Sequence, residues 1–209
     1  MKLGSKKAKI IAGIAAAAVL TVVLVLVAIG APDSSPEPGD RVVATLNGEG
    51  ITEKDVYKMQ VKYWWAYGQD LSSPEALEML IMQKLLYQEA ERGGHVPTIA
   101  QTEYEWTQHL DLTLEQIRAQ LDVEGLCYDE YRDDYRTTLA IYNLQHAMYA
   151  AIEVTEEEAR ELYEEFRETD EEIEPFEEMR ALLIEFLRHE QWLVIVSEIR
   201  NSADVVYEP

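Results

Sequence analysis

Histidine and cysteine, which most often carry catalytic and transition-metal chemistry, are few in this sequence, and neither stands in a recognised motif. The four histidines, His95, His109, His146 and His189, form no His-Glu-x-x-His zinc pattern. The sequence holds no glycine-rich phosphate loop and no Gly-x-Ser-x-Gly nucleophile motif. Cys127 is the only cysteine, which excludes an intramolecular disulfide and a Cys-x-x-Cys redox pair. We therefore predict no catalytic residue, no metal site and no cofactor.

The best candidate for a binding surface is the aromatic stretch YKMQVKYWWAYG at residues 57–68. Neighbouring residues lie about 100° apart around a helix, so Trp64 and Trp65 cannot both face one core stripe. Aromatic residues and Met are enriched at adaptable contact surfaces. Two alternatives stay open: the tryptophans pack in a core with Trp106 or Trp192, or they contact a membrane surface. The predicted client-binding residues are Tyr57, Met59, Tyr63, Trp64, Trp65 and Tyr67.

Acidic residues outnumber basic residues by 40 to 18, which gives a formal net charge of −22 at pH 7. All of the acids, but only 14 of the basic residues, lie in residues 32–209. This balance disfavours nucleic acid as a partner, because affinity for phosphates comes largely from Lys and Arg. The acidic run at 169–178 offers the oxygen ligands that calcium prefers, but it lacks the EF-hand pattern. Solvated helix faces are the favoured interpretation of such runs.

The N-terminal region has the pattern of a membrane segment, with an uncharged apolar run at residues 10–31. The run follows Lys2, Lys6, Lys7 and Lys9. As a helix it reaches about 33 Å, enough for a hydrocarbon core of about 30 Å. The lysines favour a cytoplasmic N-terminus, which places the remainder on the extracytoplasmic side. We predict a single-pass transmembrane anchor within residues 1–31, with a cleaved signal peptide as the alternative.

The remainder is predicted to be a Pro-rich tether at residues 32–40 and one mainly helical domain at residues 41–209. Two β-branched stretches, 42–46 and 204–208, predict a two-stranded sheet that joins the ends of the domain. Between them, hydrophobic periodicity and capping signals predict helices. These cover residues 52–67, 74–92 with Ser73 as N-cap, 98–110, 114–125, 128–152, 156–166 and 176–201, with capping boxes at Thr52/Asp55, Thr113/Gln116 and Thr155/Glu158.

The order of these elements over residues 42–207 resembles the SurA/PrsA class of exported chaperones. VVATLNGEGITEKDV is similar to that family's opening strand, Asn-Gly turn and capped helix, and LEMLIMQKLLYQEAERGG and LTLEQIRAQL are similar to the helices that follow. VTEEEARELYEEF resembles the segment before the parvulin isomerase insert, and PFEEMRALLIEFLRHEQWLVIVSEIRNSADV the helix and strand after it. Only nine residues stand between Phe166 and Phe176, far fewer than a parvulin domain needs.

The resemblance implies a SurA N-terminal-like chaperone domain without the isomerase domain. It would be a membrane-anchored holdase for unfolded or newly exported polypeptides, attached to the membrane through residues 10–31. Two alternatives remain open. The chain is a tethered scaffold for one folded partner, or it is a divergent peptidylprolyl isomerase whose catalytic pocket the sequence does not reveal.

Overall fold

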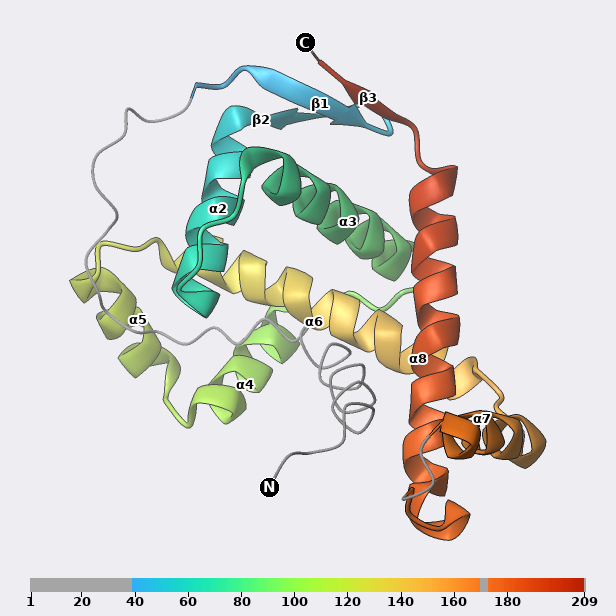
Figure 1. Ribbon diagram of the computed structural model, residues 1–209. Helices are drawn as coiled ribbons and strands as arrows, with labels where there is room; N and C mark the ends of the chain where they lie inside the picture. The colour runs from blue at the N-terminus through green and yellow to red at the C-terminus, as the bar shows by residue number, and fades with distance from the viewer. Residues whose placement is uncertain (1–38, 170–172, 209) are drawn as a thin grey trace. The chain divides into compact units, whose positions relative to one another are not determined.

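The computed structural model describes residues 39–169 and 173–208. These residues form mainly helices with one small sheet (Figure 1). The elements are β1 (Val42–Leu46), β2 (Glu49–Thr52), α2 (Glu53–Tyr67), α3 (Ser73–Arg92), α4 (Ile99–Leu110), α5 (Leu114–Val123), α6 (Tyr128–Ala151), α7 (Glu156–Thr169), α8 (Phe176–Ser202) and β3 (Val205–Tyr207). The chain divides into two compact units: residues 145–198, and the described residues on either side of that range.

The sheet has three strands in the order β2-β1-β3, and β1 is antiparallel to both of its neighbours. Asn47 and Gly48 both have positive φ, at 50° and 85°, which is the tight hairpin turn that Asn-Gly sequences favour. This turn folds residues 49–52 back onto β1. The prediction of a two-stranded sheet is therefore wrong. Residues 42–46 do pair with the C-terminal stretch, as Ala44 lies opposite Tyr207.

Local capping interactions start most of the helices. Thr52 and Asp55 form the predicted capping box of α2, and the same arrangement is present at the predicted Thr113/Gln116 and Thr155/Glu158 pairs. Helix α3 begins one residue earlier than expected, because Ser72 and not Ser73 is its N-cap. The Glu75 carboxylate accepts hydrogen bonds from the Ser72 hydroxyl and the Ser72 N–H, and this short-range contact fixes the start of the helix.

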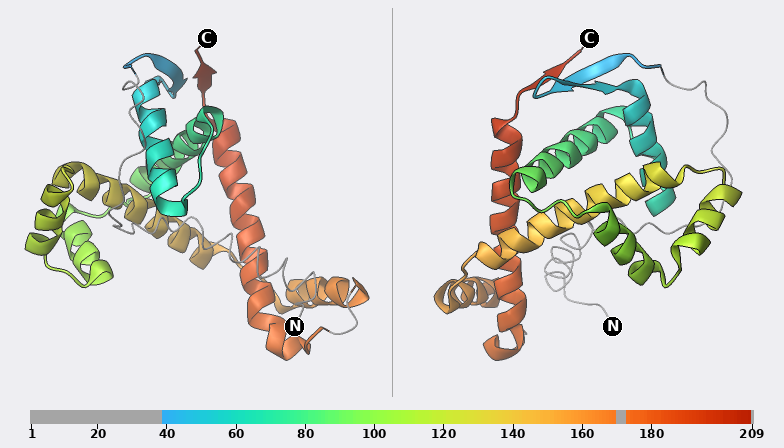
Figure 2. Two further views of the ribbon diagram at one scale, coloured as in Figure 1. Left: turned by 60° about the vertical axis from the view of Figure 1, so that its left-hand side comes forward. Right: turned by 180° about the vertical axis from the view of Figure 1, so that it is seen from behind.

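The first core of the larger unit lies beneath the sheet. Ala44, Leu46 and Ile51 are fully buried on the inner face of β1 and β2. They pack with Val56 of α2 and Ile81 of α3. Helices α2 and α3 lie on the same face of the sheet in all views (Figures 1 and 2). The sheet thus anchors the N-terminal end of α2.

A second core in this unit joins α4, α5 and the first half of α6. Trp106 and Tyr135 stack with their ring centroids 5.7 Å apart. Ile117 and Leu121 of α5 complete the cluster and are fully buried. This packing holds the first turns of α6 in place.

The smaller unit, residues 145–198, is built around α7 and α8. Ala159 of α7 is buried with Phe176, Met179 and Leu183 of α8. Tyr163 meets Phe176 edge to face, with ring centroids 5.5 Å apart. Helix α7 therefore covers the apolar residues in the first turns of α8.

The predicted single-pass membrane protein is not supported and is corrected here. None of the helices in residues 39–169 and 173–208 combines the length and apolar character that crossing a bilayer requires. The proposed anchor at residues 10–31 lies outside the described residues. The predicted extracytoplasmic location depends on a membrane-spanning helix and is likewise not supported.

Candidate functional site

Helix α2, which carries the predicted aromatic residues, is fixed at both of its ends. At the start, the Thr52 side chain accepts a hydrogen bond from the Asp55 N–H, and the Asp55 carboxylate accepts one from the Thr52 N–H. At the end, Gly68 adopts the left-handed conformation with φ 65°, and its N–H donates to the Trp64 carbonyl at 2.7 Å. The helix is therefore a rigid support for its side chains.

One face of α2 belongs to the core beneath the sheet. Val56 is buried there, and Met59 is partly buried against the same cluster. The Gln60 amide donates to the Leu71 carbonyl at 2.7 Å and so ties α2 to the loop before α3. Farther along, Tyr63 and Tyr67 pair with ring centroids 4.7 Å apart. Met59 is thus largely a core residue, whereas the tyrosine pair continues beyond the core.

A second face of α2 is held by ion pairs to the first turns of α6. The Lys58 ammonium lies 3.6 Å from Glu130, and the Lys62 ammonium lies 2.6 Å from Asp134. Between these acids on α6, burial raises the pKa of the Tyr131 hydroxyl, and the carboxylates of Asp134 and Glu130 raise it further. The sequence analysis missed these two pairs. A sequence pattern could have indicated them: Lys58 and Lys62 are four residues apart, and so are Glu130 and Asp134.

The third face of α2 carries Tyr57, Val61 and Trp64, which follow one another at helical spacings of four and three residues. All three side chains are half-buried. Two other described tryptophans are buried far more deeply: Trp106 and Trp192 are each only 1% exposed. Trp64 therefore presents indole surface to solvent that the two core tryptophans do not.

The six predicted client-binding residues differ in how far their side chains are buried. Tyr57, Met59, Tyr63 and Trp64 are half-buried, Tyr67 is 41% exposed, and the side chain of Trp65 lies outside the described part of the chain. Tyr63 and Tyr67 are in ring contact. We define the α2 aromatic surface as Tyr57 and Trp64 of the third face together with the Tyr63–Tyr67 pair at the end of the first. It is a partly covered apolar surface with two lysines beside it.

A metal site is one possibility for the part of the chain that the structure describes. Within the described residues, no three His, Cys, Asp or Glu side chains are arranged to hold a metal ion. His189 is buried in the smaller unit, where its Nδ1 lies 3.0 Å from the Tyr149 hydroxyl. The partly exposed rings of the α2 aromatic surface can make noncovalent contacts with apolar and aromatic groups.

Comparison with known proteins finds weak similarity to solved structures. No family model matches this sequence, and no curated protein matches it either. Among solved structures, it is similar to one reported with the virulence factor PEB4 and the periplasmic protein Cj1289, described as two structurally related SurA-like chaperones of Campylobacter jejuni. The TM-score is 0.44 and the identity 17%, over 61% of this chain and 50% of that chain. This chain thus matches about half the length of that structure.

Proposed function

We propose that this protein is a holdase-type chaperone, which binds non-native polypeptides without a catalytic step. The observation that carries the proposal is that none of the described aromatic residues of the α2 aromatic surface is fully buried. Trp is highly buried on average, and contiguous exposed apolar groups commonly mark interaction sites. The resemblance of residues 42–207 to the SurA/PrsA class supports the same function.

The geometry of α2 fits a surface that binds weakly and releases readily. The core beneath the sheet and the ion pairs to α6 hold the helix, so binding does not have to order it. Each aromatic ring is already partly covered, so a client gains only the remaining exposed area. At about 25 cal/mol per Å² of apolar area, this gain is small, and part of it is offset by ordering of the client. Micromolar or weaker affinity follows from this balance.

Suppression of aggregation tests the proposal. The full chain is mixed with several unrelated chemically unfolded proteins, and light scattering is followed after dilution from denaturant. We expect delayed aggregation of all of them at roughly stoichiometric amounts. Suppression for one protein alone supports the rival interpretation, a scaffold for a single partner.

A matched pair of variants tests the location. Tyr57→Ala/Trp64→Ala removes two rings of the α2 aromatic surface, and Ile99→Ala/Tyr104→Ala removes two exposed apolar side chains of α4. The first variant should need about tenfold more protein for equal suppression, because a tenfold change is about 1.4 kcal/mol and needs only about 55 Å² of the area that the two half-buried rings still expose. The α4 variant should act like the wild type. Circular dichroism and thermal melts confirm that both variants are folded, and equal suppression by all three proteins contradicts this site.

Prolyl isomerisation tests the remaining rival interpretation, a divergent isomerase. The wild-type chain should leave the cis–trans exchange of a Xaa-Pro test peptide at its uncatalysed time of tens to hundreds of seconds. A rate that rises in proportion to protein concentration would establish a catalytic site.

A further inference from the structure

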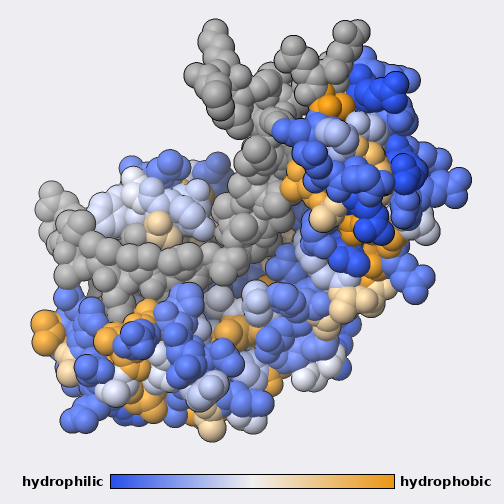
Figure 3. Space-filling model, turned by 90° about the horizontal axis from the view of Figure 1, so that it is seen from below, coloured by the Kyte–Doolittle hydropathy of each residue, from blue (hydrophilic) through white to orange (hydrophobic). Residues whose placement is uncertain are grey.

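Helix α8 carries an exposed apolar pair within the smaller unit. Leu193 is 45% exposed and Val194 is 58% exposed, whereas the adjacent Trp192 is buried. Leu193 and Val194 follow Trp192 directly, so they lie about 100° and 200° around the helix from its buried side. Figure 3 shows one face of the molecule, on which hydrophobic side chains lie among hydrophilic ones.

Two carboxylates flank this pair on the same side of the helix. Glu190 precedes Val194 by four residues and Glu198 follows it by four, and residues at this spacing are neighbours on a helix surface. Both glutamates are exposed, and within the described residues neither has an ion-pair partner. We define the α8 patch as Glu190, Leu193, Val194 and Glu198.

The charge balance of the smaller unit determines what can occupy the α8 patch. Residues 145–198 contain 17 acidic and four basic residues. Each of the four arginines is already paired with a glutamate of the unit: Arg160, Arg167, Arg180 and Arg188. The surplus negative charge disfavours a second copy of this chain, whose net charge is −22. It favours an occupant with basic side chains.

The spacing of the carboxylates further defines the occupant. Eight helical residues separate Glu190 from Glu198, a distance of about 12 Å along the axis. In an extended chain, alternate side chains point to the same face, and residues four apart are separated by about 13 Å. An extended segment of the pattern basic–x–apolar–x–basic therefore places two cations over the glutamates and its central apolar side chain over Leu193 and Val194.

We propose that the α8 patch binds extended polypeptide segments with this basic–x–apolar–x–basic pattern. The inference rests on the proposed chaperone function, for which it names a class of client segment and a second contact surface. Lys and Arg are seldom buried in protein cores, so basic segments of a non-native chain stay exposed and can contact this surface.

Three labelled peptides test the pattern by fluorescence anisotropy with the full chain. One carries Lys-Thr-Leu-Thr-Lys between Ser-Gly ends, the second has the same composition with adjacent lysines, and the third has Glu in place of both Lys. We expect the first peptide to bind about three- to tenfold more tightly than the second at low salt, because each exposed ion pair contributes modestly. The third peptide should not bind. At 0.5 M NaCl the preference should disappear, since such exposed pairs are screened.

Matched variants assign the effect to the α8 patch. Glu190→Gln/Glu198→Gln should remove the preference for the first peptide. Glu161→Gln/Glu168→Gln removes the same charge from exposed positions of α7 and should keep the preference. Leu193→Ser/Val194→Ser should weaken the binding of both lysine peptides. Equal binding of the two lysine peptides to the wild type, or a preference that survives in Glu190→Gln/Glu198→Gln, overturns the proposal.

The two proposals fail separately. If the chain suppresses aggregation but does not distinguish the peptides, the α8 patch is rejected and the chaperone function stands. If it distinguishes the peptides but protects none of the unfolded proteins, the α8 patch stands as a peptide site and the chaperone function is rejected.

Discussion

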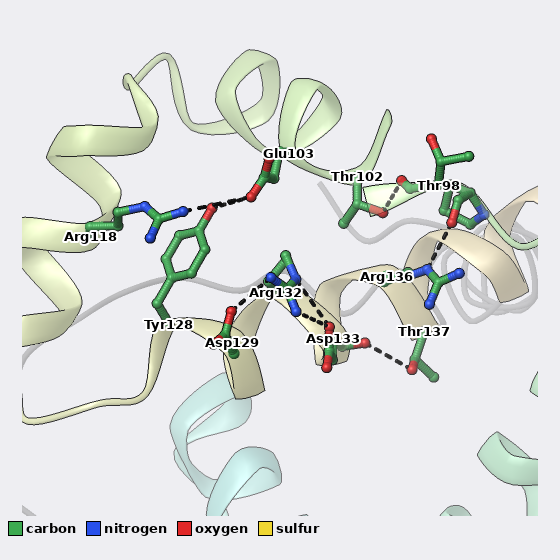
Figure 4. Close-up of polar contacts among 11 residues, drawn as sticks. Thr98, Thr102, Glu103, Arg118, Tyr128, Asp129, Arg132, Asp133, Arg136 and Thr137 are labelled. Carbon is green, nitrogen blue, oxygen red and sulfur yellow. Dashed lines mark hydrogen bonds and ion pairs between the residues drawn. The ribbon is translucent and has the colours of Figure 1, made fainter. Parts of the chain in front are cut away.

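Tyr128 lies between two charged side chains from different helices, and it illustrates how single residues hold the α4–α5–α6 core together. Its hydroxyl donates to the Glu103 carboxylate of α4 at 2.8 Å, and the Arg118 guanidinium of α5 lies 3.7 Å from its ring centroid (Figure 4). Burial raises the pKa of the Tyr128 hydroxyl, and the hydrogen bond to Glu103 raises it further. The neutral hydroxyl is therefore the form that stabilises the fold.

Replacing Tyr128 by Phe tests this contact. The loss of the hydrogen bond should lower the free energy of unfolding by about 1 kcal/mol at pH 7. Because the folded-state pKa is raised, the stabilisation by Tyr128 is present below pH 10 and is lost as pH rises through the folded-state value. Wild type should therefore lose more stability than Tyr128→Phe between pH 9 and pH 11, measured by urea unfolding. The exposed Tyr104→Phe serves as control, and a wild-type loss equal to that of Tyr128→Phe contradicts this role.

Among the secondary-structure elements, β3 depends most on contacts distant in sequence. The Asn47 N–H donates to the Asp204 carbonyl at 2.8 Å, and the Glu208 N–H donates to the Val43 carbonyl at 2.9 Å. Val205 packs against the core beneath the sheet. Beside it, Tyr207 donates a hydrogen bond to Glu78 of α3. A strand of three residues is thus held by backbone hydrogen bonds at both of its ends and by the side chains of Val205 and Tyr207.

Truncation after Ser202 removes these contacts and leaves β1 with an unpaired edge. We expect the free energy of unfolding to fall by about 2 kcal/mol or more, since the truncation removes the partial burial of Val205 and the backbone hydrogen bonds of β3, which contribute about 1 kcal/mol each. The truncated protein should also aggregate more readily, because exposed strand edges pair with other chains. Val206→Thr alters an exposed side chain of the same strand and should change stability by less than about 0.5 kcal/mol. An unchanged urea midpoint after truncation would show that β3 does not stabilise the sheet.

The sequence predicted those features that depend on neighbours along the chain. The capping box of Thr52 and Asp55 is an example, because both partners lie within one turn. It did not predict β2, since Glu49–Thr52 has only four residues and includes Gly50, so no alternating β pattern precedes the helix. Its strand character comes from pairing with β1 after the turn. The same limit applies to Trp64, whose exposure is decided by the elements packed around α2 and not by its neighbours in sequence.

At the scale of the whole molecule, net charge dominates the response to salt. The chain has 40 acidic and 18 basic residues. Many of its ion pairs join exposed side chains, such as Lys58 with Glu130, and such pairs contribute about 0–1 kcal/mol each. Repulsion among the remaining acids acts over the Debye length, which is about 30 Å at 0.01 M salt and about 10 Å at 0.1 M. Self-repulsion of this kind destabilises a compact chain.

We therefore predict that salt stabilises this protein. Raising NaCl from about 0.01 to 0.5 M at pH 7 should increase the unfolding temperature by about 3–6 °C, equivalent to about 1–2 kcal/mol for a chain of this size. The increase should shrink as pH approaches the sequence pI of about 4.4, where repulsion is already weak. Sucrose at equal osmolality is the non-ionic control. A lower unfolding temperature in salt would mean that the ion pairs outweigh the repulsion.

In high salt the repulsion among acids is screened, and a second effect of pH on stability remains. Lowering the pH weakens the repulsion, but this second effect destabilises the fold. The pKa of Glu75 is lowered by its hydrogen bonds with Ser72, that of Glu158 by its bonds with Thr155, and that of Glu156 by Arg160. A lowered folded-state pKa stabilises the fold above the unfolded-state value of about 4.5, and this contribution is lost as pH falls through the folded-state pKa. In 0.5 M NaCl, stability should thus decline below about pH 4.5. Glu75→Gln/Glu158→Gln keeps hydrogen-bonding oxygens at both caps without a titrating group, so its thermal unfolding should depend less on pH there. Identical acid profiles for this variant and the wild type would show that the two capping carboxylates do not set the acid limit.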